Sequence, residues 1–242
     1  MTDLKVLVLM PAWNEAAAIG DTIKELRATL PEMDLLVIDD GSTDDTVSIA
    51  RAAGATVVQL PYHLGVGGAM RMGYKYAFRY GYDRAIQVDS DGQHDPGNIR
   101  SVLAGLDEAD ISIGARFADK GTYVVTGPRK WAMTFLARVV SHLAGTRLTD
   151  ITSGFRAGNR TAMAQYSEHY PIEYLGDTVD SLVVAIRSGL SVTQVPVEMR
   201  PRRAGKPSNN PWKASVYLGR AILALLVAMT RSRVKNRKTI AE

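Results

Sequence analysis

The chain has 242 residues, of which 46% are hydrophobic and 22% charged. This mix is typical of a globular protein and argues against disordered and fibrous proteins. The chain contains no cysteine, which excludes disulfides, thiolate nucleophiles and cysteine-bound metal centres. Its length predicts one main domain with one active site, and because no secretory signal pattern precedes the first strand-like run, we expect a cytoplasmic protein.

Charge is divided unevenly along the chain. Residues 200–242 contain 11 Lys and Arg and one acid, a net charge of +10, whereas residues 1–199 carry −6. A basic segment of this kind can bind an anionic membrane face, a phosphorylated substrate or nucleic acid. We therefore predict two parts, a folded domain over 1–199 and a basic partner-binding segment over 200–242.

Apolar runs of strand length alternate with segments of helical period through the first half of the chain. This alternation is typical of an α/β protein with a mainly parallel central sheet flanked by helices. Strands are expected at 5–10, 35–39, 56–60, 85–88 and 111–114, and helices at 16–29, 44–53, 66–80 and 99–106. Farther along we expect a loop at 121–129, a helix at 130–143, an irregular polar turn at 150–156, a helix at 178–188 and a strand at 192–197.

A last helix is expected to begin at Asn210 and Pro211, a favourable pair for the N-cap and first turn. It contains the run AILALLVAM, which is shorter than the roughly 17 to 25 apolar residues that span a bilayer. Because basic residues flank the run, an amphipathic helix lying in a membrane interface is favoured. The alternative is a helix packed on the protein's own core or on a second copy.

Polar motifs follow three of the expected strands, namely PAWNE, DDGSTDDT and DSDGQHD. Ligands of open parallel sheets bind outside the carboxyl ends of the strands, so one shared crevice is predicted. Asp89 and Asp91 are two residues apart and project to the same side of an extended chain, with Gln93 next. Such oxygen ligands suit Mg²⁺ or Mn²⁺. The motif therefore predicts a divalent-cation site, with an ordinary solvated turn as the alternative.

Asp39 and Asp40 end another apolar strand, where a carboxylate can accept hydrogen bonds from ribose hydroxyls or a base N–H. The segment HLGVGGAMRMG follows the third expected strand and opens a helix. Its glycine spacing departs from G-x-G-x-x-G, which argues against a Rossmann dehydrogenase. Gly68, Arg71 and the helix N-terminus can still hold a diphosphate. The alternative is that these glycines only let helix and sheet pack closely.

Taken in order, these motifs and the later TDITSGFR resemble glycosyltransferase family 2, whose members share the nucleotide-diphospho-sugar transferase (GT-A) fold. Within the family the chain most resembles the dolichyl- or polyprenyl-phosphate sugar synthases, the polyprenol-phosphate mannose synthase type. The resemblance covers nearly the whole chain. It implies inverting transfer of a hexose or N-acetylhexosamine from a UDP- or GDP-linked donor to a polyprenyl or dolichyl phosphate. It also implies a peripheral enzyme at the cytoplasmic membrane face, and some compact members work with a small membrane protein.

The resemblance assigns roles residue by residue. The nucleotide would contact Pro11, Asn14, Glu15, Asp39 and Asp40, and the predicted nucleotide set is completed by Gly68, Arg71 and Ser90. The cation on the donor diphosphate would be held by Asp89, Asp91 and Gln93. The acceptor phosphate would be received by Arg116, Ser153, Arg156, Arg202 and Lys206, with Asp91, Arg116 and Arg156 as the catalytic residues. At Lys206 the stretch RRAGKPS departs from the family pattern of a glycine followed two residues later by Ser-Lys. None of the four histidines receives a metal or catalytic role.

The kind of acceptor decides whether a general base is needed. A phosphate monoester, with a second pKa of about 6, is already anionic at neutral pH and needs none, and arginines grip phosphate bidentately. If the enzyme instead extends the hydroxyl of a polysaccharide or glycolipid, Asp177 is the candidate base. A third hypothesis is a non-catalytic module that binds an anionic surface. Nucleic acid is disfavoured as its partner because the basic stretch lacks interleaved aromatic residues.

Overall fold

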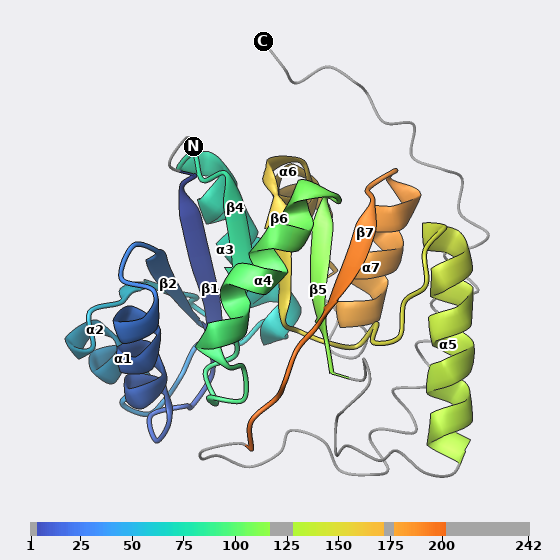
Figure 1. The fold of residues 1–242 in the computed structure, drawn as a ribbon. Coiled ribbons are helices and arrows are strands. Elements are labelled where there is room, and N and C mark those ends of the chain that lie inside the picture. Colours follow the sequence, from blue (N-terminus) through green and yellow to red (C-terminus); the bar gives the residue numbers. More distant parts are fainter. Residues whose placement is uncertain (1–3, 117–127, 172–176, 202–242) are drawn as a thin grey trace.

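The computed structural model describes residues 4–116, 128–171 and 177–201. In this part of the chain, seven strands form one sheet in the order β3-β2-β1-β4-β6-β5-β7 (Figure 1). The strands are β1 (Val6–Ala12), β2 (Asp34–Asp39), β3 (Thr56–Gln59), β4 (Arg84–Gln87), β5 (Ile111–Ala115), β6 (Arg156–Asn159) and β7 (Val192–Pro196). The helices are α1 (Ile19–Thr29), α2 (Thr46–Ala52), α3 (Gly65–Arg79), α4 (Ile99–Ala104), α5 (Pro128–Ala144), α6 (Arg160–His169) and α7 (Asp177–Arg187), with short 3-10 turns at Pro96–Asn98 and Gly105–Asp107.

The sheet is mainly parallel, as the alternation of strands and helices predicts. β1 pairs in parallel with β2 and β4, β2 with β3, and β5 with β7. β6 is antiparallel to both of its neighbours, β4 and β5. The sequence did not predict β6 or α6, because the strand reads Arg-Ala-Gly-Asn and contains no β-branched or aromatic residue. Its place in the sheet is set by its neighbours and not by its own propensity.

Helices cover both faces of the sheet, which is why its strands read as continuous apolar runs. Leu7 and Leu9 of β1 pack in one cluster with α3, α6 and α7, whereas Val8 and Met10 pack in the other with α1, α2 and α4. Alternate residues of a strand point to opposite faces, so one strand contributes to both clusters. Figure 1 shows this layering, with α4 in front of the sheet and α3 and α6 behind it.

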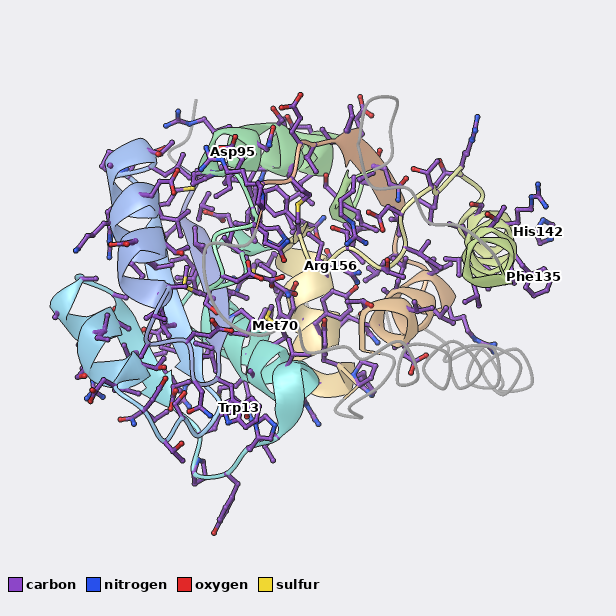
Figure 2. All side chains as sticks on the ribbon, turned by 90° about the horizontal axis from the view of Figure 1, so that it is seen from below. Trp13, Met70, Asp95, Phe135, His142 and Arg156 are labelled. Atoms are coloured by element: carbon purple, nitrogen blue, oxygen red, sulfur yellow. The ribbon has the colours of Figure 1, made fainter. Side chains whose placement is uncertain are left out.

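The parallel strands place their carboxyl ends at one edge of the sheet. β1, β2 and β4 all run toward the lower edge in Figure 1, from which Figure 2 is viewed. Because β6 runs the opposite way, its first residue, Arg156, and the Ser-Gly-Phe before it lie at this same edge. β6, which the sequence did not predict, therefore brings the Ser-Gly-Phe-Arg motif to the same edge as the motifs that follow β1, β2 and β4.

No helix in the described ranges is both long and apolar enough to span a membrane. The boundary predicted between residues 199 and 200 stays a prediction, because only residues 200 and 201 of the second part are described. The expected last helix lies in the segment 202–242, outside the described residues. Arg202 and Lys206 lie there too, so their predicted contacts stay predictions.

Candidate active site at the carboxyl edge of the sheet

The loops after β1 and β2 are tied together by hydrogen bonds. The Asn14 N–H donates to Ser42 Oγ (2.9 Å), Asn14 Oδ1 accepts from the Thr43 N–H (2.8 Å), and the Glu15 N–H donates to Thr46 Oγ1 (2.8 Å). Asn14 has a φ of 55°, in the left-handed region that asparagine tolerates better than most residues. This bonding fixes the relative position of the PAWNE and DDGST loops before any ligand arrives.

Asp39, at the tip of β2, is buried and only partly satisfied. Its Oδ2 accepts a hydrogen bond from the Ser42 N–H (3.3 Å). Its Oδ1 has no hydrogen-bond partner within the described ranges. A buried acceptor without a partner costs about 1–3 kcal/mol, so this oxygen is suited to a donor group that arrives with a ligand.

Asp40, next along the chain, is engaged by the start of α3. Its two carboxylate oxygens accept from the N–H groups of Leu64 (2.7 Å) and Gly65 (2.8 Å), and Oδ2 lies 2.8 Å from His63 Nδ1. Burial raises the pKa of Asp40, and these contacts offset that effect only in part. Asp40 therefore holds the loop that begins α3, and its contact with a nucleotide stays a prediction. His63 in turn stacks on the exposed ring of Trp13, with centroids 4.1 Å apart.

Other predicted nucleotide contacts have structural partners. A Cβ at Gly68 would lie 2.4 Å from the Cβ of Leu64, one turn earlier at the start of α3, so this glycine makes room for the Leu64 side chain, and its contact with a diphosphate stays a prediction. The Arg71 guanidinium donates to the carbonyls of Ser167 (3.4 Å) and Glu168 (2.7 Å). Basic side chains stabilise helix C-termini in this way, so Arg71 joins α3 to the end of α6, and its contact with a diphosphate stays a prediction.

Three further predicted residues lie in or beside the strands. Pro11 is paired with Ile38 of β2 in the sheet register. The Glu15 carbonyl accepts from the N–H of Ile19 (3.0 Å) and so begins α1. Ser90 is buried, and its carbonyl accepts from Thr22 Oγ1 (3.1 Å). All three positions border the crevice that the sequence predicts, and their contacts with a nucleotide stay predictions.

The acidic loop after β4 presents oxygen ligands of unequal exposure. The Asp89 side chain is 40% exposed, and its Oδ1 accepts from Gln87 Nε2 (3.2 Å). Asp91 is buried, and its Oδ1 accepts from the Gln93 N–H (2.9 Å). Among the described residues, no three His, Cys, Asp or Glu side chains gather as a metal site. This donor set fits Mg²⁺ or Mn²⁺, since Mg²⁺ binds through one or two carboxylates and completes its shell with waters and substrate phosphates.

The Ser-Gly-Phe loop before β6 lies directly against this acidic loop. A Cβ at Gly154 would lie 3.0 Å from Gln87 Nε2 and 3.5 and 3.6 Å from the two carboxylate oxygens of Asp89. Ser153 is buried, and its Oγ accepts from the Phe155 N–H (3.2 Å). The structure thus brings the predicted acceptor motif and the predicted cation ligands together, and glycine is the residue that lets them meet this closely.

Arg156, by contrast, is not open to a ligand in this structure, because its exposed fraction is 0%. Its Nε and Nη2 donate to the Ser153 carbonyl (3.1 and 2.6 Å), and Nη1 donates to the Thr178 carbonyl (3.0 Å) and to Ser181 Oγ (3.2 Å). The guanidinium therefore joins the Ser-Gly-Phe loop to α7. This geometry favours a positioning role over the predicted direct contact with the acceptor phosphate, although no observation tests that contact.

Arg116, just after β5, forms a bidentate ion pair with the buried Asp150. Its Nε lies 2.7 Å from Oδ2 and its Nη2 lies 2.9 Å from Oδ1, and Nη2 also donates to Thr152 Oγ1 (2.8 Å). The Arg116 side chain keeps 30% exposure whereas that of Asp150 has none. Arg116 is therefore the described member of the predicted acceptor set that is both oriented and accessible.

Replacing Asp150 by Asn is expected to lower the free energy of unfolding by about 3 kcal/mol at pH 7, because Arg116 loses its buried partner. Burial raises the pKa of Asp150, but hydrogen bonds and charge from Arg116 outweigh it, so the net pKa lies below its usual value. A lowered folded-state pKa gives stability that is present above the unfolded value of about 3.9 and is lost as pH falls through the folded value. Urea unfolding at pH 7 and pH 3 should show the difference between the proteins shrink at pH 3.

The matched control is Asp107→Asn. Asp107 is an exposed partner of Arg84 at 2.6 Å, and such surface pairs contribute about 0–1 kcal/mol. An equal loss in both variants, or an Asp150→Asn loss that is independent of pH, would contradict the assignment.

Three residues of this edge have no role in the sequence prediction. Trp13 lies beside the start of α3 (Figure 2). His94 is buried, and its Nδ1 accepts from the Asp89 N–H (3.0 Å). Arg200 joins Glu25 (2.5 Å) on α1 to Asp95 (2.8 Å) after the acidic loop. The usable signals were an aromatic residue inside a polar loop motif and a histidine directly after the predicted cation ligands.

The fold and this edge define a class, the GT-A glycosyltransferases. A crystal structure of glucosyl-3-phosphoglycerate synthase from Mycobacterium tuberculosis with Mn²⁺, UDP-glucose and phosphoglyceric acid matches with a TM-score of 0.68 and 23% identity, covering 93% of this chain and 80% of that one. Another structure of that enzyme matches with a TM-score of 0.69 and 24% identity, covering 93% and 81%. At these identities the likeness shows the fold, and the predicted GT-A fold is confirmed.

Sequence comparisons give the family. The profile of Glycosyl transferase family 2 matches residues 7–167. Undecaprenyl-phosphate mannosyltransferase of Micrococcus luteus is 33% identical, with 84% of this chain and 86% of the relative covered. Polyprenol monophosphomannose synthase of Mycolicibacterium smegmatis is 28% identical, with 83% and 79% covered. The chain belongs to glycosyltransferase family 2, and the predicted family is confirmed.

Proposed function

We propose that this chain transfers a hexose or N-acetylhexosamine, with inversion, from a UDP- or GDP-linked donor to polyprenyl or dolichyl phosphate. The observation that carries the proposal is the close approach of Gly154 to the Asp89 carboxylate, whose oxygens would lie 3.5 and 3.6 Å from a Cβ at Gly154. It supports an acceptor site next to the proposed site of the donor diphosphate. The same acceptor class is supported by the activities for which the relatives from Micrococcus luteus and Mycolicibacterium smegmatis are named, and by a UDP-N-acetylglucosamine–dolichyl-phosphate N-acetylglucosaminyltransferase from Methanococcus voltae.

The donor half of the site is assigned from the loops after β1, β2 and β4. Asp39 Oδ1, which has no hydrogen-bond partner among the described residues, accepts a hydrogen bond from the base or ribose, and the exposed ring of Trp13 offers a face for the base. Asp89, Asp91 and Gln93 hold Mg²⁺ or Mn²⁺ against the diphosphate. The bound ion supplies neutralisation of the charge that grows on the leaving nucleoside diphosphate.

The acceptor half needs no general base, because the attacking phosphate oxygen is already anionic. Arg116, held in orientation by Asp150, binds that phosphate, and Arg202 and Lys206 extend the binding surface. Arg156 positions the Ser-Gly-Phe loop by joining the Ser153 carbonyl to α7. The segment 200–242, with a net charge of +10, attaches the enzyme peripherally to the anionic cytoplasmic face of the membrane. A small membrane protein as partner stays a prediction.

The test is transfer of label from radioactive UDP-glucose, UDP-N-acetylglucosamine and GDP-mannose to polyprenyl phosphate in detergent micelles. We expect chloroform-extractable product with one donor, lost in excess EDTA and restored by Mn²⁺ or Mg²⁺. Unphosphorylated polyprenol is the matched acceptor control and should receive no label. Label that enters only a water-soluble glycan would overturn the proposal.

The hydroxyl-acceptor hypothesis makes a separate prediction at Asp177, whose side chain lies outside the described residues. If the acceptor is a lipid phosphate, Asp177→Asn should keep the lipid-linked product at a similar rate. Loss of all transfer in this variant, with an unchanged unfolding temperature, would favour a carboxylate base and a hydroxyl acceptor.

A further inference from the structure

His94 is a buried residue whose imidazole lies beside both the backbone amide and the side-chain carboxylate of Asp89, a proposed cation ligand. Its Nδ1 accepts a hydrogen bond from the Asp89 backbone N–H at 3.0 Å. Its Nε2 lies 3.7 Å from Asp89 Oδ2, beyond hydrogen-bond distance but with its edge toward the carboxylate. One side chain therefore faces both the amide and the carboxylate of Asp89.

The hydrogen bond from the Asp89 backbone determines which ring nitrogen of His94 carries the hydrogen. Because the Asp89 N–H donates to Nδ1, that nitrogen carries no hydrogen, and the hydrogen of the neutral ring is on Nε2. Nε2–H is then the ring atom on the side of the Asp89 carboxylate, whose Oδ2 lies 3.7 Å away. With its Nδ1 lone pair already used by Asp89 and its Nε2 carrying a hydrogen, His94 is not arranged to be a cation ligand itself.

Two other segments hold the ring in place. Phe155 of the Ser-Gly-Phe loop stacks on it, with centroids 4.6 Å apart and an interplanar angle of 16°. The backbone after β7 forms a bridge between Met199 and His94, and the Arg200 N–H donates to the Gln93 carbonyl (2.9 Å). His94 thus lies where the acidic loop, the Ser-Gly-Phe loop and the segment after β7 meet.

We propose that His94 is a positioning residue that fixes Asp89 for binding the divalent cation and the donor diphosphate. The proposal rests on the proposed function, because it requires a cation at Asp89 and Asp91. Removing the Nδ1 acceptor leaves the Asp89 N–H without a partner and lets the loop turn its carboxylate away. Losing a residue that orients a metal ligand reduces metal affinity by roughly 10- to 100-fold.

The experiment distinguishes the effect of the Nδ1 hydrogen-bond acceptor from the effect of the size of the His94 ring. In His94→Asn the amide oxygen takes the place of Nδ1, whereas His94→Leu fills the space with no acceptor and His94→Gln carries its amide farther out, near the place of Nε2. Mn²⁺ binding to the full chain is measured by electron paramagnetic resonance with UDP present, and each variant is melted to show that it is folded. His142→Asn, on the exposed face of α5 (Figure 2), is the control.

We expect the Leu and Gln variants to bind Mn²⁺ at least roughly 10-fold more weakly, while Asn stays within about threefold of the wild-type protein and His142→Asn is unchanged. If His94→Leu does not fold, the Mn²⁺ affinities of His94→Gln and His94→Asn are compared and test the proposal by themselves. Wild-type affinity in the Gln variant, or an equal loss in Asn and Gln, overturns the role of His94 and leaves the proposed function standing. Absence of Mn²⁺ binding by the wild-type protein overturns both.

Discussion

Asp91→Asn is expected to reduce the rate of sugar transfer by roughly 10²- to 10³-fold, the effect typical of losing one group that stabilises transition-state charge. Asp91 is buried, and the amide oxygen of Asn can still accept the hydrogen bond that Asp91 Oδ1 takes from the Gln93 N–H. The loop should therefore keep its shape while losing a negative charge that the cation needs. Initial rates at saturating donor and Mn²⁺, with circular dichroism of both proteins, measure the effect.

Asp95→Asn is the matched control in the same loop. Its carboxylate accepts from the Gly97 N–H (2.9 Å) and pairs with Arg200 (2.8 Å), so it faces away from the proposed cation. We expect a loss below about fivefold, the scale of a pair worth about 1 kcal/mol or less. Rates in Asp91→Asn within tenfold of the wild-type protein, together with transfer that survives EDTA, would show that the cation is held elsewhere or is not used.

The fold was predictable wherever a strand carries its own apolar signal. Leu7 to Met10 are buried by helices on both faces of the sheet, so β1 reads as an unbroken apolar run. β6 carries no such signal, since its Arg-Ala-Gly-Asn sequence is held by pairing with β4 and β5. These pairings join residues far apart in the sequence, and a local pattern does not encode them.

The candidate site was predictable in its location and less so in its contacts. Strand ends place Asp39, Asp89 and Asp91 at one edge, because parallel strands finish together. The hydrogen-bond partners of the charged side chains could not be predicted in this way. Arg71 binds the carbonyl of Glu168, 97 residues away, and Asp40 binds backbone N–H groups of the loop before α3. A sequence shows that a charged side chain is present, whereas only the fold shows whether that side chain is already hydrogen-bonded to a backbone group.

Arg156 shows this difference most clearly, and its replacement is expected to cost as much stability as the replacement of Asp150. Arg156→Met preserves most of the side-chain volume but removes both donors to the Ser153 carbonyl, at 3.1 and 2.6 Å, and one of the donors to the Thr178 carbonyl, which keeps the Ser181 hydroxyl. A buried acceptor left unsatisfied costs about 1–3 kcal/mol, and each further lost hydrogen bond about 1 kcal/mol, so we expect the free energy of unfolding to fall by about 3 kcal/mol. For a chain of this length that lowers Tm by roughly 6–12 °C, measurable by calorimetry.

The matched control is Arg160→Met, four residues on. The Arg160 guanidinium lies 4.8 Å from the Phe78 ring centroid and donates to the Tyr82 carbonyl at 3.3 Å, but the residue is exposed, so a loss of about 1 kcal/mol or less is expected. If Arg156 instead contacts the acceptor directly, Arg156→Met should melt like the wild-type protein and raise the KM for polyprenyl phosphate alone. A buried positioning residue gives the opposite pattern: a lower Tm, with kcat reduced for every donor and acceptor, since the loop that meets Asp89 is no longer held.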